Sequence, residues 1–194
     1  QETDIPPGVL NVVNSSDHAI GAMLSTDPRV DLVSFTGSTA TGRKVMERAA
    51  RTITPVGLEL GGKDPMIVLA DADLERAANG AAYYSLLNGG QICISVERIY
   101  VEDAIYGPFV ERVADKVAKL RQGAPGAAGS VDVGAVTSPA QLEIIDAHVR
   151  DAVAKGARVL TGGRRAAGPG QFYEPTVLAD VDHSMDVMRE ETFG

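Results

Sequence analysis

Short apolar segments alternate with helix-like segments along this chain, and this alternation most constrains the fold that it can adopt. In the first third, the apolar segments at 9–13, 30–35 and 55–60 are typical of buried strands. The segments between them, 17–24 and 40–50, are typical of helices. Strand, crossover helix and strand together form the repeating unit of a parallel sheet. The sequence therefore predicts an α/β fold with parallel strands.

The alternation begins again after Gly61 and Gly62. Strands are expected at 66–69, 94–101 and 156–160, with an extended segment at 172–178. A helix capped by Asp71 or Asp73 is expected to run to about Leu87, and amphipathic helices are expected at 105–120 and 139–155. The glycine pair is thus the expected boundary between two ordered parts of the chain.

Composition excludes several classes of function. The 26 acidic residues outnumber the 18 basic ones, and a net charge of −8 without a basic block disfavours binding to nucleic acid or to an anionic membrane. No apolar run approaches the ~20 residues that span a bilayer, and the acidic start, residues 1–4, is unlike a signal peptide. One cysteine cannot form an internal disulfide, which favours a cytoplasmic location.

Metal chemistry is not expected either. The chain has no C-x-x-C, H-E-x-x-H or acidic calcium loop. Its three histidines are scattered, and His148 is expected to lie on a solvated helix face. The Met185–Met188 segment is expected to pack in the core rather than to bind a ligand.

Cys93 and Glu59 are the residues with the clearest chemical potential. Cys93 follows Gly89, Gly90 and Gln91, a setting that suits a reactive thiol held near backbone N–H groups. The alternative is a buried cysteine acting as a small hydrophobe. Glu59 lies between apolar residues at a strand end, where partial burial would raise its pKa toward that of a general base. The alternative is an exposed or salt-bridged glutamate.

The segment from Phe35 to Gly42 joins a strand to a helix. Helix N-termini bind phosphate through unpaired N–H groups and the positive end of the dipole. The glycine spacing, G-x-x-x-x-G, is neither the usual dinucleotide fingerprint nor a P-loop. The alternative is a well-capped helix without a ligand, with Ser38 or Thr39 as the cap.

Taken together, several short blocks resemble the aldehyde dehydrogenase superfamily. The blocks are Pro6–Val13, Phe35–Thr39, Leu58–Lys63, Gly90–Cys93 with Arg98, and Glu190–Gly194. The resemblance implies parts of two Rossmann-like three-layer α/β/α domains. Residues 1–60 would be the C-terminal part of a dinucleotide-binding domain, and 61–194 the N-terminal part of the catalytic, thiol-bearing domain. The segments 93–98 and 190–194 are similar to a succinate-semialdehyde dehydrogenase-like branch.

The resemblance also implies a reaction and its site. An aldehyde would be oxidised to a carboxylic acid with NAD or NADP, through a thiohemiacetal and a thioester on the cysteine, in a homodimer or homotetramer. The implied roles are nucleophile for Cys93, base for Glu59, pyrophosphate contacts for Gly37 and Ser38, the nicotinamide end for Leu60 and Gly61, the nicotinamide ribose for Glu191, and nicotinamide packing for Phe193.

Other functions remain open at this point. A CoA-acylating aldehyde dehydrogenase would pass the thioester to CoA, although the retained Glu59 favours hydrolysis. A non-catalytic scaffold or crystallin-like protein would keep the fold alone, and a cysteine hydrolase would need no cofactor. The resemblance further implies an internal fragment, with the family's oxyanion asparagine before residue 1 and the oligomerisation segment after residue 194. We therefore expect the chain alone to be catalytically incomplete.

Overall fold

The computed structural model of the chain describes residues 4–194, so most of the acidic N-terminal segment, residues 1–3, lies outside the described residues. The chain divides into two compact units, and the division falls between Leu60 and Gly61. Among the described residues, no helix has both the length and the apolar character needed to cross a membrane.

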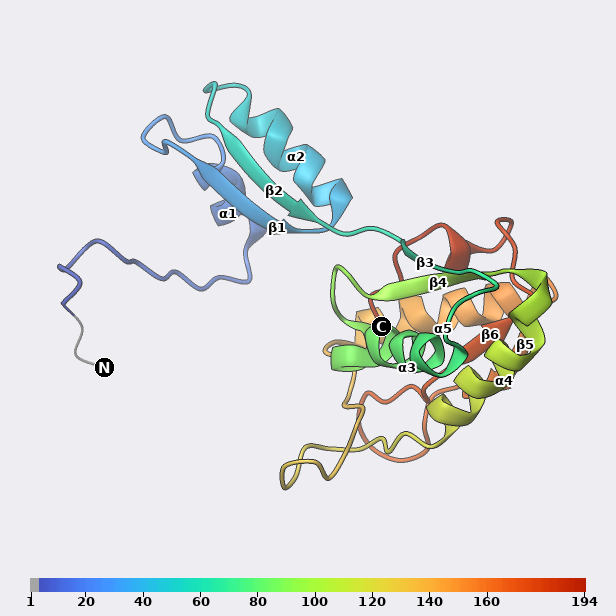
Figure 1. The fold of residues 1–194 in the computed structure, drawn as a ribbon. Helices are drawn as coiled ribbons and strands as arrows, with labels where there is room; N and C mark the ends of the chain where they lie inside the picture. The colour runs from blue at the N-terminus through green and yellow to red at the C-terminus, as the bar shows by residue number, and fades with distance from the viewer. Residues whose placement is uncertain (1–3) are drawn as a thin grey trace. The chain divides into compact units, whose positions relative to one another are not determined.

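The first unit contains one parallel pair of strands. Strand β1 (Val33–Gly37) pairs in register with β2 (Val56–Leu60), so that Thr36 lies opposite Glu59. Helix α1 (His18–Leu24) precedes the pair, and helix α2 (Thr39–Ala49) connects its two strands and lies along it (Figure 1). The predicted parallel β-α-β unit is therefore confirmed.

Local chemistry explains where these two helices begin. The Asp17 side chain accepts a hydrogen bond from the N–H of Ala19 and caps α1. The Ser38 hydroxyl accepts one from the N–H of Thr41 and caps α2. Gly42 brings α2 close to β2, because a Cβ at this position would lie 2.6 Å from a methyl carbon of Leu60.

The strand predicted at 9–13 is wrong. These residues have no strand or helix assignment, and Val9, Leu10, Val12 and Val13 are 68–78% exposed. A strand forms only where its N–H and C=O groups find a neighbouring strand. Within the described part of the first unit, β1 and β2 pair with each other alone.

The second unit is also α/β and holds two separate strand pairs. Strand β3 (Asp64–Val68) runs parallel to β4 (Val96–Val101), whereas β5 (Arg158–Thr161) runs antiparallel to β6 (Val177–Ala179). The extended segment expected at 172–178 is a strand only at its end. The helices are α3 (Leu74–Leu86), the 3₁₀ turn η1 (Leu87–Gly90), α4 (Asp103–Ala118), α5 (Pro139–Ala154) and the 3₁₀ turn η2 (Asp186–Met188).

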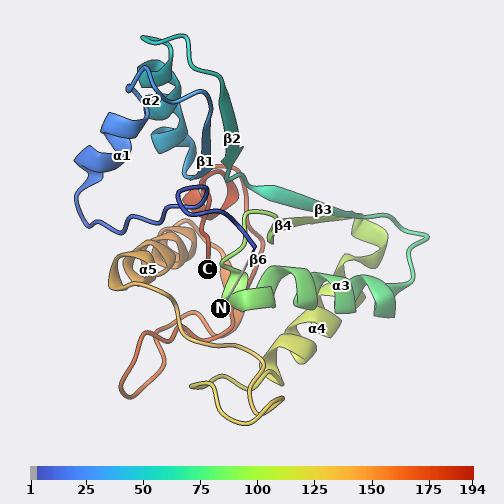
Figure 2. The same ribbon diagram turned by 90° about the vertical axis from the view of Figure 1, so that its left-hand side faces the viewer.

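Helices α3 and α4 lie side by side next to the β3–β4 pair (Figure 2). The cap of α3 is Asp73, not Asp71: its carboxylate accepts hydrogen bonds from the N–H groups of Glu75 and Arg76. Met185 and Met188 are 1% and 5% exposed, which confirms that this segment packs in the core.

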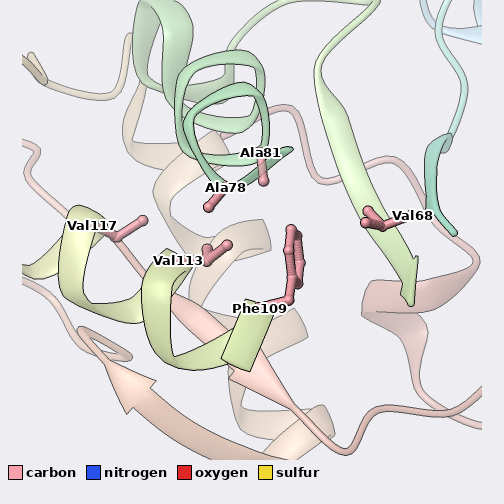
Figure 3. Packing of buried hydrophobic residues seen from close by; sticks show 6 residues of the cluster. All are labelled: Val68, Ala78, Ala81, Phe109, Val113 and Val117. Atoms are coloured by element: carbon pink, nitrogen blue, oxygen red, sulfur yellow. The ribbon is translucent and has the colours of Figure 1, made fainter. Parts of the chain in front are cut away.

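The main core forms where α3 meets α4. The ring of Phe109 on α4 is 2% exposed and lies among aliphatic side chains of α3, α4 and β3 (Figure 3). Two alanines, Ala78 and Ala81, provide the α3 surface and are fully buried. Such small side chains let the two helices approach closely, and the large ring fills the remaining space.

We predict that Phe109→Ala lowers the free energy of unfolding by about 3–5 kcal/mol, because it removes a buried ring and leaves a cavity. Urea titration followed by circular dichroism measures the change. Tyr84→Ala is the control, since this ring is 56% exposed and its loss is expected to cost less than about 1 kcal/mol. Equal losses in the two variants would contradict the packing described.

Candidate active site

The Cys93 thiol lies on an exposed turn between η1 and β4. Asn88, Gly89 and Gly90 have φ angles of 54°, 66° and 76°, so the chain reverses sharply before the cysteine. After it, the buried Ser95 hydroxyl lies 3.2 Å from the carbonyl oxygens of Tyr84 and Ser85 at the end of α3. The exposure of Cys93 contradicts the alternative of a buried, small-hydrophobe cysteine.

The side chain of Gln91 fixes this turn to a neighbouring loop. Its amide oxygen accepts hydrogen bonds from the N–H and the hydroxyl of Thr137, at 2.8 and 2.7 Å. Its amide nitrogen donates to the carbonyl of Asn88, and the Asn88 side chain donates to the Gln91 carbonyl. The hydrogen-bonding groups of the Gln91 side chain are therefore all occupied within the protein. The thiol two residues later is held on a braced turn.

In the first unit, Glu59 is exposed rather than partly buried as expected. It lies on β2 between Leu58 and Leu60, whose side chains alternate with it and are half-buried. Leu60 points toward α2, where it contacts Gly42. Successive side chains of a strand alternate between faces, so Glu59 lies on the face away from the helix.

The proposed phosphate-binding segment is a well-formed helix start. Gly37 ends β1, and a Cβ there would lie 2.6 Å from the ring of Phe35. Ser38 caps α2, and no acidic residue lies in its first turn. The first N–H groups of a helix have no partner within it, and this end of α2 therefore suits an anion.

In the second unit, Glu191 lies directly over Gly61. A Cβ on Gly61 would come within 1.9 Å of a carboxylate oxygen of Glu191, so only glycine leaves room for this carboxylate. The carboxylate also accepts a hydrogen bond from the backbone of Gly62. Burial raises the pKa of Glu191, and the nearby negative charge of Glu97 adds to the increase. Two residues with predicted cofactor roles, Gly61 and Glu191, are thus in contact.

The segment 191–194 then continues to the cysteine turn. A Cβ on Gly90 would lie 2.8 Å from the carbonyl carbon of Gly194, so these two glycines meet closely. The C-terminus lies beside the end of α3 (Figures 1 and 2). The segment therefore contacts both the glycine pair before β3 and the turn that carries Cys93.

A buried ion pair holds the segment 191–194 in place. The Lys63 ammonium lies 2.8 Å from a carboxylate oxygen of Glu97, and the two side chains are 5% and 8% exposed. Lys63 also donates to the hydroxyl of Thr192 at 3.0 Å. Burial lowers the pKa of Lys63, while the Glu97 carboxylate acts in the opposite direction and favours the charged form.

His148 belongs to the same cluster, which corrects the expectation of a solvated histidine. It is half-buried on α5, and its Nδ1 lies 3.1 Å from the Thr192 hydroxyl. Burial lowers the pKa of His148, and the positive charge of Lys63 lowers it further. The helix position alone did not reveal this contact, because Thr192 lies 44 residues further along the chain.

Lys63, Glu97 and Thr192 are functional candidates that the sequence analysis did not single out. The sequence did offer one signal for this ion pair: Lys63 and Glu97 have opposite charges and lie at the starts of two apolar strands. Charged residues at such positions are rarely buried unless they are paired. Within residues 4–194, no three histidine, cysteine, aspartate or glutamate side chains gather closely enough to hold a metal ion.

Comparison with known proteins gives a consistent result. The aldehyde dehydrogenase family model matches residues 1–194. The chain is 43% identical to succinate-semialdehyde dehydrogenase [NADP(+)] GabD of Escherichia coli K12, over 98% of this chain and 39% of the relative. It is 42% identical to lactaldehyde dehydrogenase of the same organism, over 100% of this chain and 40% of the relative.

Solved structures show the same similarity. A crystal structure of succinate-semialdehyde dehydrogenase from Burkholderia pseudomallei matches with a TM-score of 0.94 and 42% identity, over 98% of this chain and 39% of that one. The chain thus spans about two fifths of the length of the relatives that it matches.

The cluster around Thr192 predicts a pH-dependent stability. Since the pKa of His148 is lowered in the folded chain, the unfolded chain binds a proton more readily. We expect the free energy of unfolding to fall as the pH drops from about 7.5 through about 6.5, the pKa of a histidine in the unfolded chain. His148→Gln is expected to reduce that loss. Urea midpoints at pH 7.5 and about 5.5 measure it, with the exposed His18→Gln as matched control. An equal loss in wild type and His148→Gln would contradict the assignment.

Proposed function

Because the chain belongs to the aldehyde dehydrogenase family, we propose that its protein oxidises an aldehyde to a carboxylic acid, with NAD+ or NADP+ as acceptor. The observation that carries the proposal is the exposed thiol of Cys93 on a braced turn in contact with the 191–194 segment. A cysteine kept only for packing would be buried.

The residues present suit a dinucleotide. Gly37 and Ser38 stand at the start of α2, where free N–H groups would hold the pyrophosphate. Leu60 and Gly61 would line the nicotinamide end. Glu191 would accept hydrogen bonds from the nicotinamide ribose, and Phe193, which is 37% exposed, would pack beside the nicotinamide. When bound, the dinucleotide supplies the acceptor for a hydride.

Cys93 begins the proposed reaction. Its thiolate attacks the aldehyde carbon, so that a C–S bond forms and the carbonyl electron pair moves to oxygen. The backbone N–H of Cys93, together with a partner, would stabilise this oxyanion. The C=O bond then re-forms as the C–H bond breaks, the bound dinucleotide would be the acceptor of the hydride, and a thioester on Cys93 remains. Capture by sulfur is useful because the tetrahedral oxyanion is a far better hydride donor than a free aldehyde.

Glu59 completes the reaction. Its carboxylate accepts a proton from water, and the resulting hydroxide attacks the thioester carbon. The C–S bond breaks, the Cys93 thiolate leaves and the carboxylic acid is released. The retained carboxylate favours water as the acyl acceptor over CoA. A CoA-acylating enzyme and a non-catalytic scaffold are the alternatives, and the exposed thiol weighs against the latter.

The names of several relatives suggest a substrate class. Three of the names specify succinate semialdehyde, lactaldehyde and glutarate semialdehyde, which are small polar aldehydes. We propose a substrate of this class, and succinate semialdehyde first. The family resemblance supports a homodimer or homotetramer, and the single cysteine supports a cytoplasmic location. The exposed apolar side chains at Val9, Leu10, Val12 and Val13 are consistent with a covered surface in such an assembly.

Two substitutions test the chemistry. In the full-length protein, Cys93→Ala is expected to lower aldehyde-dependent NAD(P)H formation by at least about a thousandfold, because no thioester can form. Glu59→Gln is expected to lower steady-state turnover by about 10²–10⁴-fold while a first burst of NAD(P)H remains, because only release from sulfur is slowed. Stopped-flow absorbance at 340 nm measures both. Turnover that survives Cys93→Ala would refute the covalent route.

Gly61 provides a separate test of the cofactor site. Gly61→Ala places a methyl group where the Glu191 carboxylate lies, so this carboxylate must move. We expect the Kd for NAD(P)+ to rise about tenfold, the effect of losing a hydrogen bond to a charged group. Fluorescence titration measures it. Gly107→Ala, on α4 with open space around it, is the control and should bind as the wild type does. Unchanged affinity in Gly61→Ala would remove Glu191 from the site.

A further inference from the structure

Glu97 is a buried carboxylate with an unusual set of donors. One oxygen lies 2.8 Å from the Lys63 ammonium, and the other accepts from the backbone N–H groups of Thr192 and Phe193 at 3.0 and 2.8 Å. A carboxylate with 8% of its side chain exposed is stable only when its oxygens are occupied in this way. Two of the donors belong to the segment proposed to contact the nicotinamide.

Phe193 adopts a backbone conformation that needs external support. Its φ angle is 53°, in the left-handed region that bulky side chains rarely occupy. Such a residue stays there only where the surrounding structure enforces it, and strained residues of this kind cluster at functional sites. The Glu97 carboxylate accepts hydrogen bonds from the consecutive N–H groups of Thr192 and Phe193, and these bonds hold the backbone in this conformation.

The other contacts of Thr192 hold the same segment without reaching the proposed cofactor residues. Its hydroxyl meets Lys63 and His148, and its carbonyl accepts a hydrogen bond from the Gln141 side chain. Thr192 is 8% exposed, whereas Phe193 is 37% exposed. The anchor residue is therefore buried, and the aromatic ring next to it is presented outward.

We propose, on the basis of the proposed function, that Glu97 is a positioning residue for the nicotinamide-contacting segment Glu191–Phe193. Glu97 follows Cys93 by only four residues, so one short stretch carries both the nucleophile and the anchor. The anchor thereby sets where the ring of Phe193 lies relative to the turn of the thiol. Lys63 has a supporting role, since its ammonium group lies 2.8 Å from the Glu97 carboxylate and holds it in place.

Two double variants separate this role from that of a structural ion pair. Lys63→Met/Glu97→Gln and Lys63→Met/Glu97→Leu both remove the buried charges, and both keep side chains of similar size. Only the first retains an oxygen that can accept the N–H groups of Thr192 and Phe193. Removing both charges together avoids leaving one buried charge unpaired, which would destabilise either single variant.

Two readouts decide the question in the full-length protein. We expect the Kd for NAD(P)+ to be at least about tenfold higher in the leucine variant than in the glutamine variant, corresponding to a lost hydrogen bond. We expect hydrogen exchange at the Thr192 and Phe193 amides, measured without cofactor, to be faster in the leucine variant by a similar factor. Glu111→Gln, an exposed glutamate on α4, is the control for both readouts.

The outcomes distinguish a failure of the positioning role of Glu97 from a failure of the proposed function. Equal amide exchange in the two double variants would overturn the positioning role of Glu97, whatever the protein catalyses. Faster amide exchange in the leucine variant with an unchanged Kd would show that the segment does not reach the cofactor. This result would also overturn the positioning role. A wild-type protein that binds neither NAD+ nor NADP+ would instead refute the proposed function, while amide exchange would still report on the anchor.

Discussion

The buried contact between Lys63 and Glu97 is the interaction on which the second unit's candidate site depends. Two charges withdrawn from water are costly, and the cost is offset here because each has further partners. Those partners come from the segment 191–194, far along the chain. The pair therefore does more than join the starts of β3 and β4: it fixes a distant segment beside the two strands that supply the charges.

Packing elsewhere in the unit makes this local geometry possible. The buried alanines of α3 let α4 approach, and the ring of Phe109 fills the space between them. The end of α3 is thereby fixed, and the glycine turn that follows it leads directly to Cys93. Gly90 contacts Gly194 at the same place. The core thus determines where the thiol lies, and the ion pair holds the segment 191–194 next to the turn that carries it.

Much of the secondary structure could be predicted from the sequence, because strand and helix periodicity and capping residues are local properties. Ser38 and Asp73 cap their helices as their positions suggest. The segment 9–13 shows the limit of such reasoning: its composition suits a strand, but a strand also needs a neighbour. The exposure of Glu59 was missed because alternation along β2 gives two faces without saying which one is covered.

The candidate site was predictable only in part. The cysteine that follows a glycine pair and the Glu-x-x-Gly pattern of the 191–194 segment are visible as short motifs. The anchor was not visible, because Glu97 and Thr192 are 95 residues apart and nothing in the sequence links the two motifs that contain them. His148 was misjudged for the same reason, since a histidine on a helix is half-buried or solvated according to contacts that sequence spacing does not encode.

The central claim is that an acyl group is carried on Cys93. Mixing the full-length protein with excess succinate semialdehyde and NADP+, quenching with acid during the first turnover and mapping peptides by mass spectrometry tests it most directly. The account predicts that the peptide containing Cys93 gains the mass of the succinyl group, and that the gain disappears when the quench is delayed until substrate is exhausted. NADPH formation without any acyl adduct on that peptide, or with the adduct on another residue, would contradict it.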